Sequence, residues 1–216
     1  MNTSEKKKWS RWRQNNFEFF EKNLKNIRHN DIVVDIGCGE GQFKAFFNNV
    51  KKYIGIDFQE FPGVTTLITD LTKPIPLESD LADIVFISNV LEHIPTPEAL
   101  IAEAHRLLKD DGMIIGTVPY IRDVHQAPYD FLRYTHFMLE KMFTDAGFKD
   151  IEITPIGTPF DVYQVVQDIF CKVNGSYQRR YATAIGKEIN ISSYQIVHSH
   201  IKNMSLTQRF CRRIRV

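Results

Sequence analysis

Apolar runs and amphipathic stretches alternate along the first 157 residues of this 216-residue chain. Runs rich in β-branched residues predict strands buried on both faces, at 32–34, 51–58, 64–70, 83–89, 112–120 and 149–157. Apolar residues at helical spacing predict helices at 15–27, 42–48, 97–108, 136–148 and 160–173. Strands that alternate with helices predict an α/β fold with a doubly wound, mostly parallel sheet. Ligands of such sheets bind beyond the carboxyl ends of the strands.

The first strand runs into a glycine-rich loop, in the sequence DIVVDIGCGEG at residues 31–41. Gly37, Gly39 and Gly41 permit backbone angles that other residues avoid, and they let a ligand lie against the chain. The spacing is D-x-G-x-G-x-G, beginning at Asp35, whereas a dinucleotide fingerprint requires G-x-G-x-x-G. A carboxylate in this place favours a ligand that carries positive charge. The alternative is a glycine-rich turn with an incidental aspartate.

This loop resembles motif I of the class I S-adenosylmethionine (SAM) dependent methyltransferases. The sequence SNVLEHI at 88–94 is a second resemblance, and the two together relate residues 30–155 to that family. A third stretch, H-x-x-P-x-D-F-x-R-Y-T at 125–135, resembles a subset of these enzymes associated with surface polysaccharides and glycolipids. The resemblance implies a seven-stranded Rossmann-like sheet with helices on both faces, SAM as cofactor, and methyl transfer as the reaction.

Candidate cofactor residues follow from the strand ends and from the resemblance. Asp35 suits the positive charge of SAM, and Asp57 ends the second strand, where a carboxylate accepts hydrogen bonds from both ribose hydroxyls. Asp57 serves NAD equally well. Phe58, the next residue after Asp57, is expected to pack against the adenine ring, and the resemblance places the adenine amino group near Asp70 and Leu71. The full set is Asp35, Gly37, Cys38, Gly39, Gly41, Asp57, Phe58, Asp70, Leu71, Ser88 and Asn89.

Candidate acceptor residues lie after the fourth and fifth strands. A hydroxyl acceptor needs a base, and the candidates are His125 first and His93 second. Contacts with the acceptor are predicted for Tyr120, Tyr129, Arg133 and Tyr134, with Arg133 on a phosphate or carboxylate and the rings on sugar faces. The alternative is a structural loop in which Asp130 pairs with Arg133. The sequence shows no His/Asp/Glu cluster at ligand spacing, so no metal is expected.

Length and composition agree with one α/β domain and an appendage. We expect a basic N-terminal segment and leading helix at 1–29, a SAM-binding core at 30–155, and a helical, basic C-terminal extension at 156–216. The seventh strand of the family has no clear position, and the stretch 208–216 is one candidate. Three cysteines without metal-like spacing predict reduced thiols and a cytoplasmic protein. No apolar run is long enough to cross a membrane, and no secretory segment opens the chain.

Charge is distributed unevenly, although the net charge is only +1. Residues 1–13 carry +4 and residues 172–216 carry +8, so the body between them is acidic. Basic ends suit an anionic partner, such as the inner face of a membrane, a nucleic acid or a phosphorylated acceptor. A solvated tail is the alternative, and for the C-terminal extension a lid or a homodimer contact also remains open.

The sequence therefore predicts a SAM-dependent methyltransferase that acts on a small-molecule, glycan or glycolipid acceptor, at oxygen. Three alternatives remain. A nucleic-acid methyltransferase or RNA-binding protein would use the basic ends, although no recognition module is visible. An NAD-dependent oxidoreductase would share the fold, and an inactive SAM-fold scaffold would transfer nothing.

Overall fold

A computed structural model describes residues 9–163 and 165–166 of the chain. Several sequence-based predictions lie outside the described residues. These are the basic stretches 1–8 and 172–216, the end of the predicted helix at 160–173, and the seventh strand at 208–216. Within the described residues, 159–163 and 165–166 have helical backbone, as expected for the start of that helix. No described helix has both the length and the apolar character required to span a bilayer.

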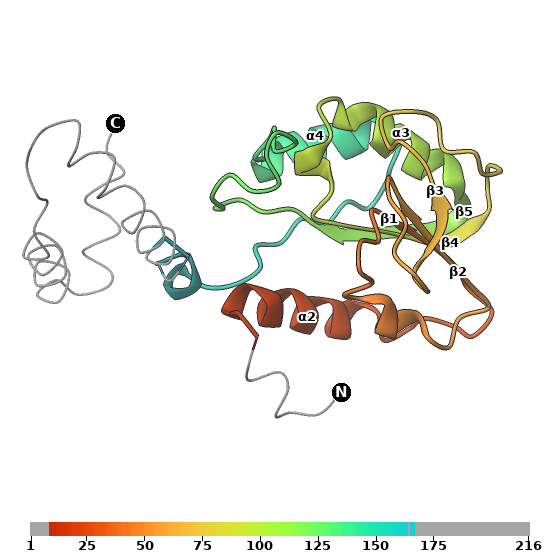
Figure 1. The fold of residues 1–216 in the computed structure, drawn as a ribbon, viewed down its shortest axis with the longest axis horizontal. Helices are drawn as coiled ribbons and strands as arrows, with labels where there is room; N and C mark the ends of the chain where they lie inside the picture. The colour runs from red at the N-terminus through yellow and green to blue at the C-terminus, as the bar shows by residue number, and fades with distance from the viewer. Residues whose placement is uncertain (1–8, 164, 167–216) are drawn as a thin grey trace, which may run out of the picture. The chain divides into compact units, whose positions relative to one another are not determined.

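Five parallel strands form one sheet in the order β3-β2-β1-β4-β5 (Figure 1). The strands are β1 (Ile32–Ile36), β2 (Lys52–Asp57), β3 (Thr65–Ile68), β4 (Ala82–Ser88) and β5 (Leu108–Thr117). β1 lies at the centre, with β2 on one side and β4 on the other. The strand order reverses between β1 and β4, and crevices for ligands form at such switch points. All the carboxyl ends lie along one edge of the sheet because every pair is parallel.

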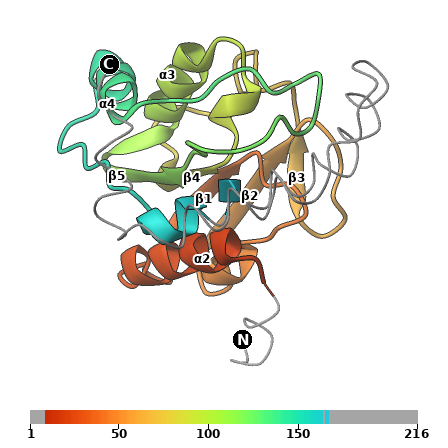
Figure 2. The same ribbon diagram turned by 90° about the vertical axis from the view of Figure 1, so that its left-hand side faces the viewer.

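Helices cover both faces of the sheet, as predicted. The leading helix α2 (Arg11–Asn23) lies on one face, and α3 (Pro97–Leu107) and α4 (His136–Asp145) lie on the other (Figure 1 and Figure 2). Thr135 caps α4 through a hydroxyl that accepts from the Met138 amide. Two short 3-10 helices, η1 (Lys44–Phe47) and η2 (Leu91–His93), follow β1 and β4.

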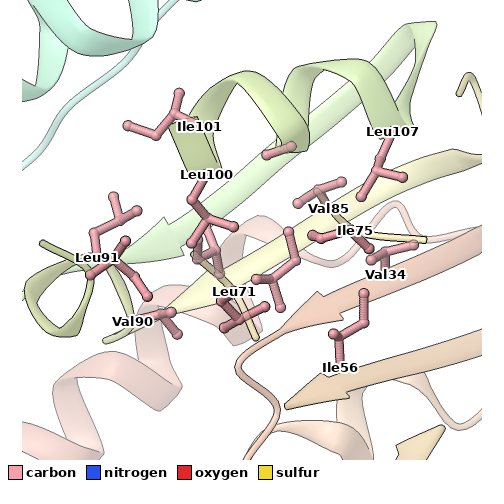
Figure 3. Close-up of a cluster of buried hydrophobic side chains, with 14 of the residues drawn as sticks. Val34, Ile56, Leu71, Ile75, Val85, Val90, Leu91, Leu100, Ile101 and Leu107 are labelled. Carbon is pink, nitrogen blue, oxygen red and sulfur yellow. The ribbon is translucent and has the colours of Figure 1, made fainter. Parts of the chain in front are cut away.

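Alternate residues of the strands enter separate hydrophobic clusters on the two faces. On the α3 side, Val34 and Val85 pack with Leu100 and Leu107 (Figure 3). On the α2 side the cluster is largely aromatic, and Phe20 is fully buried there. Its ring lies 4.8 Å from the Phe43 ring and 4.7 Å from the Phe86 ring, measured between centroids. Burial on both faces fixes the strand register, which in turn positions the residues at the strand ends.

The structure corrects the expected strand count from seven to five within the described residues. The stretch 149–157, predicted as the sixth strand, forms no ladder there. Asp150 has a positive φ of 51°, and Pro155 has no amide hydrogen to donate to a ladder. Ile153 nevertheless packs against the core, which explains its apolar character.

Two predicted boundaries also differ. The turn after β1 is a 3-10 helix rather than an α-helix, because its amides bond to carbonyls three residues earlier. β5 begins at Leu108 instead of residue 112, and α3 gives way to it without a loop. A register shift beside Ala82 accommodates this early start.

Candidate functional site

The glycine loop is fastened to the second strand by backbone hydrogen bonds. The amides of Gly37 and Cys38 both donate to the carbonyl of Ile56, at 2.8 Å and 3.0 Å. The tips of β1 and β2 therefore form one rigid edge.

Two of the loop glycines are needed for different reasons. Gly37 has φ +72°, and a Cβ atom there would lie 2.3 Å from the Val90 side chain, so packing excludes a larger residue. Gly39 has φ +49°, yet a Cβ atom there would meet nothing within 4 Å. Its surroundings are open, as expected where a ligand lies against the backbone.

The Asp57 carboxylate joins the tip of β2 to the loop. One oxygen accepts from the Gly39 amide at 2.9 Å, and the other accepts from the Gln59 amide at 3.3 Å. The side chain is buried, and the next residue, Phe58, is 67% exposed. A fixed carboxylate beside an exposed aromatic ring fits the ribose and adenine contacts expected of these two residues.

Asp35, at the tip region of β1, is a buried carboxylate whose partner is the Tyr53 hydroxyl. The hydroxyl donates to its Oδ2 at 2.5 Å. Burial raises the pKa of Asp35 to about 7; the Tyr53 hydrogen bond opposes this, and the charge of nearby Asp57 adds to it. Asp35 and Asp57 are near enough for their charges to interact, so together they favour a cationic ligand. The sulfonium and ammonium groups of SAM carry such positive charges.

The remaining cofactor candidates differ in exposure. Asp70 is exposed and accepts from the amide and the hydroxyl of Thr72, at 2.9 Å and 2.7 Å. The pKa of Asp70 is lowered, and the hydrogen bond from the Thr72 hydroxyl is the largest cause. Leu71 belongs to the core cluster on the α3 side. Cys38 is a buried free cysteine, and burial raises the pKa of its thiol to about 11, so it is an unreactive thiol at neutral pH.

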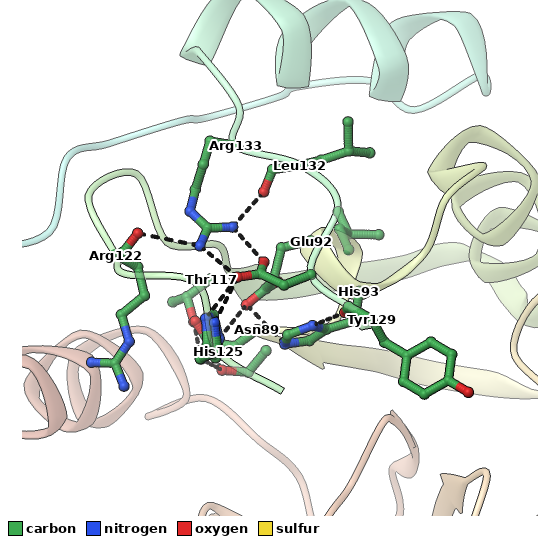
Figure 4. A network of polar contacts seen from close by, with 12 residues as sticks. Asn89, Glu92, His93, Thr117, Arg122, His125, Tyr129, Leu132 and Arg133 are labelled. Carbon is green, nitrogen blue, oxygen red and sulfur yellow. Dashed lines mark hydrogen bonds and ion pairs between the residues drawn. The ribbon is translucent and has the colours of Figure 1, made fainter. Parts of the chain in front are cut away.

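Polar side chains meet at the tips of β4 and β5 (Figure 4). The hydroxyl oxygens of Ser88 and Thr117 lie 2.8 Å apart, and the Asn89 amide nitrogen donates to both hydroxyls. Asn89 has a positive φ of 56°, and its backbone amide donates to the Thr117 carbonyl at 2.7 Å. The side chains predicted to line the site after β4 are thus brought together with the end of β5.

The segment 118–135, here called the acceptor loop, docks onto η2 through hydrogen bonds to backbone carbonyls of η2. The Phe131 amide donates to the Glu92 carbonyl at 2.8 Å, and the Tyr134 hydroxyl donates to the Leu91 carbonyl at 2.7 Å. This docking brings the two predicted histidines together. Their ring centroids lie 4.9 Å apart.

Glu92 is the site residue that the sequence analysis missed. Its side chain is fully buried, and neither carboxylate oxygen has a hydrogen-bond partner among the described residues. Its Oε1 lies 3.7 Å from Nε2 of His93 and 4.0 Å from Nε2 of His125 (Figure 4). Burial raises the pKa of Glu92 to about 7. The signal was present as the glutamate of SNVLEHI, but its contact with His125 depends on how the chain folds.

The fold brings together three potential metal ligands that the residue spacing did not indicate. One atom each from Glu92, His93 and His125 lies within 4.8 Å of the others. Residue spacing did not indicate it because His125 comes from the acceptor loop, 32 residues after His93.

Each histidine of the cluster is held through its Nδ1 atom. In His93 this atom lies 2.5 Å from the Tyr129 carbonyl oxygen, and burial lowers the pKa of the ring. In His125 it lies 3.2 Å from Asp130 Oδ2 and 3.1 Å from the Asp123 carbonyl oxygen. Both Nε2 atoms are thereby directed toward Glu92 (Figure 4).

Other acceptor-loop candidates divide into buried and exposed side chains. Arg133 forms two bonds to the Asp130 carboxylate, at 2.7 Å and 3.0 Å, and this bonding holds the pKa of Asp130 well below its usual range. The structure thus contains the Asp130 and Arg133 pair of the structural alternative. Tyr134 is buried, so its surroundings do not support the predicted acceptor contact. Tyr120 and Tyr129 are 67% and 63% exposed.

Comparison with known proteins gives the site its context. A family model described as a methyltransferase domain matches residues 6–153. The chain belongs to this family. A methyltransferase domain of this kind supports SAM as the cofactor.

Several similar proteins are named as methyltransferases. A probable S-adenosylmethionine-dependent methyltransferase of Mycobacterium tuberculosis is 25% identical over 135 residues, covering 55% of this chain and 49% of that protein. A ubiquinone biosynthesis O-methyltransferase of Pseudomonas syringae is 30% identical over 96 residues, covering 38% and 41%. The methyltransferase thus spans about half or less of the curated relatives that it matches.

The fold has solved counterparts. The crystal structure of a SAM-dependent methyltransferase from Aquifex aeolicus aligns with a TM-score of 0.55 at 21% identity, covering 73% of this methyltransferase and 94% of that chain. At this identity the likeness concerns the fold alone.

Substituting the two loop glycines should separate stability from cofactor binding. We expect Gly37→Ala to lower the free energy of unfolding by about 2 kcal/mol or more, because the methyl group overlaps Val90. Gly39→Ala should cost only about 1 kcal/mol through its positive φ, but it should weaken SAM binding by filling open space beside the loop. Denaturant unfolding and SAM titration by calorimetry measure the two effects. Normal SAM affinity in Gly39→Ala would exclude that glycine from the cofactor site.

Proposed function

We propose that this methyltransferase transfers the methyl group of SAM to an oxygen atom of a small-molecule, glycan or glycolipid acceptor. The observation that carries this proposal is the pair of histidines beside the tip of β4. Each has its Nδ1 held by an acceptor, which leaves Nε2 available to the reaction.

For the cofactor, we assign the edge formed by β1 and β2. Asp57 would accept hydrogen bonds from the ribose hydroxyls, and Phe58 would pack on the adenine ring. Asp35 would face the cationic part of the molecule. When bound there, SAM supplies an electrophilic methyl group with a neutral thioether as leaving group.

For the acceptor, we assign the space beside the acceptor loop and η2. A hydroxyl must lose its proton as its oxygen forms the new bond to carbon, and the proton needs an acceptor. Asp130 holds Nδ1 of His125, so Nε2 of that ring is the atom that would take the proton. The exposed rings of Tyr120 and Tyr129 suit the faces of a sugar. The name of the Pseudomonas syringae relative, an O-methyltransferase, agrees with oxygen as the target.

A panel of acceptors tests the proposed reaction. The full chain is incubated with isotopically labelled SAM and, separately, with phenols, monosaccharides and glycolipids, amines, and RNA. We expect label on a hydroxyl-bearing acceptor as an ether. Label found only on amines or RNA would overturn the proposal, and RNA labelling would support the nucleic-acid alternative.

His125→Ala should lower turnover by about 100-fold or more, because a general base contributes at least that factor. SAM affinity should stay the same, since His125 lies on the acceptor side. His136→Ala is the matched control, because His136 is an exposed histidine at the start of α4. Single-turnover kinetics and SAM calorimetry measure the two properties. Full activity in His125→Ala would remove it from the reaction.

A further inference from the structure

The three groups that meet between η2 and the acceptor loop are Glu92, His93 and His125, here called the Glu-His-His cluster. We propose that the Glu-His-His cluster binds one divalent transition-metal ion of the Zn²⁺ type, with Oε1 of Glu92 and Nε2 of both histidines as ligands. One potential ligand atom from each residue lies within 4.8 Å of the other two.

The donor set selects the class of metal. Two imidazoles and one carboxylate are the ligands of many catalytic zinc sites, in which a fourth position stays open. Imidazole also suits iron, nickel and copper, whereas Mg²⁺ and Ca²⁺ prefer oxygen ligands alone. A tetrahedral ion with bonds of about 2.1 Å needs ligand atoms about 3.4 Å apart. The Glu92 to histidine distances of 3.7 Å and 4.0 Å approach this separation.

The hydrogen bonds around the cluster match those of histidine ligands to metals. Such histidines almost always use the second ring nitrogen to donate to a carboxylate or a backbone carbonyl. Here Nδ1 of His93 lies against the Tyr129 carbonyl, and Nδ1 of His125 lies against the Asp130 carboxylate. These contacts fix the tautomer that leaves Nε2 as the lone-pair donor on both rings.

The polar groups in the centre of the cluster need a partner that the described chain does not give them. Both Glu92 oxygens and Nε2 of His93 are buried without a hydrogen bond among the described residues. Buried polar atoms in this state are rare and costly, and a cation held at Oε1 of Glu92 would satisfy that oxygen and Nε2 of His93. The side chains of His93 and His125 are 13% and 22% exposed, which gives an ion access from solvent.

The ion would deepen the proposed function, on which this part of the inference rests. An acceptor hydroxyl at the open position would lose its proton more readily, because a bound cation lowers the pKa of a coordinated oxygen. In that state His125 holds the ion, and the proton passes to solvent instead of to its ring. The ion would also tie the acceptor loop to η2.

Metal binding is tested directly on the full chain, without any acceptor. Protein stripped with a chelator and dialysed is titrated with Zn²⁺ by calorimetry, and its metal content is measured after gel filtration. We expect one strongly bound ion per chain, and a rise in melting temperature when it is added. Glu92→Gln, His93→Ala and His125→Ala should each weaken the affinity at least tenfold. His136→Ala should leave it unchanged, because that exposed histidine lies outside the cluster.

The outcomes of the metal titration and of the methylation assay distinguish failure of the metal site from failure of the proposed function. No stoichiometric ion, or an affinity that none of the three substitutions changes, would overturn the metal site. If the chelated, metal-free chain still methylates a hydroxyl acceptor at the full rate, the ion has no part in transfer and the function stands alone. If the cluster binds its ion but no hydroxyl acceptor is ever methylated, the metal site stands and the function fails. A normal circular dichroism spectrum for Glu92→Gln confirms that loss of binding is not loss of folding.

Discussion

Asp35→Asn is expected to make the SAM-free protein more stable at pH 8 and to weaken its affinity for SAM. The folded-state pKa of Asp35, about 7, lies above the ordinary value of 3.8, chiefly because of burial. Protonated Asp35 therefore stabilises the fold fully below about pH 4. This stabilisation is lost as the pH rises through 7 and Asp35 ionises. At pH 8 the buried charge costs the fold about 2–4 kcal/mol, and asparagine removes that cost.

SAM affinity should change in the opposite direction. The neutral amide loses charge-assisted contact with the cationic ligand, which corresponds to about 1.5–3 kcal/mol, or roughly a 10- to 100-fold weaker affinity. Binding of SAM to the native protein should release up to about 0.8 of a proton at pH 6.5, because a pKa of about 7 leaves Asp35 mostly protonated there and the cation favours its carboxylate form. Calorimetry in two buffers of different ionisation enthalpy counts this proton.

Urea unfolding at pH 5, 6.5 and 8 measures the stability arm of the experiment. The advantage of Asp35→Asn over the native chain should grow with pH, and Asp110→Asn, at an exposed position in β5, should show none. A stability difference that stays constant from pH 5 to 8 would mean that Asp35 is ionised throughout. An unaltered SAM affinity would place the carboxylate outside the cofactor site.

Asp130→Ala is expected to destabilise the protein by about 3 kcal/mol and to detach His125 from its position. The Asp130 side chain is 2% exposed and the Arg133 side chain 26% exposed, so removing Asp130 leaves a partly buried guanidinium without its ion-pair partner. The same carboxylate accepts from the His125 backbone amide at 2.9 Å and lies 3.2 Å from Nδ1 of that ring. Its loss therefore affects both the acceptor loop and the histidine.

An exposed ion pair supplies the control. Lys141 and Asp145 are side by side on α4, and both side chains are more than 60% exposed. Asp145→Ala should change the free energy of unfolding by no more than about 0.5 kcal/mol. Urea unfolding compares the two variants, and protease sensitivity of residues 118–135 reports on the loop. Equal stability losses in both variants would contradict a structural role for the Asp130 and Arg133 pair.

The cofactor side of the molecule was largely predictable from sequence because its signals are local. Glycines with positive φ, a buried apolar run, and an aspartate at a strand end each depend on a few neighbouring residues. The sequence predicts Asp57 and Gly39 at one edge of the sheet, and a 2.9 Å hydrogen bond joins them in the structure. The parallel sheet followed from the alternation of strands and helices, and the structure confirms it.

The acceptor side was less predictable because its contacts are distant in sequence. In the sequence, Glu92 is only one residue of the SNVLEHI motif. The docking of the acceptor loop adds His125 to His93 as its histidine neighbours. Tyr134 is of a residue type that often contacts ligands, but its hydroxyl donates a hydrogen bond to the Leu91 carbonyl. The failure at 149–157 has a similar origin: apolar alternation reports burial of Ile153, and it carries no information on strand pairing.

The bond between the Gly39 amide and the Asp57 carboxylate limits how this enzyme could be re-engineered toward other cofactors. Grafting a longer dinucleotide loop in place of residues 37–41 would displace the amide that neutralises part of the Asp57 charge. Asp57 is only 5% exposed, so water would not easily replace that donor. Changing the cofactor would therefore require the end of β2 and the glycine loop to be redesigned together.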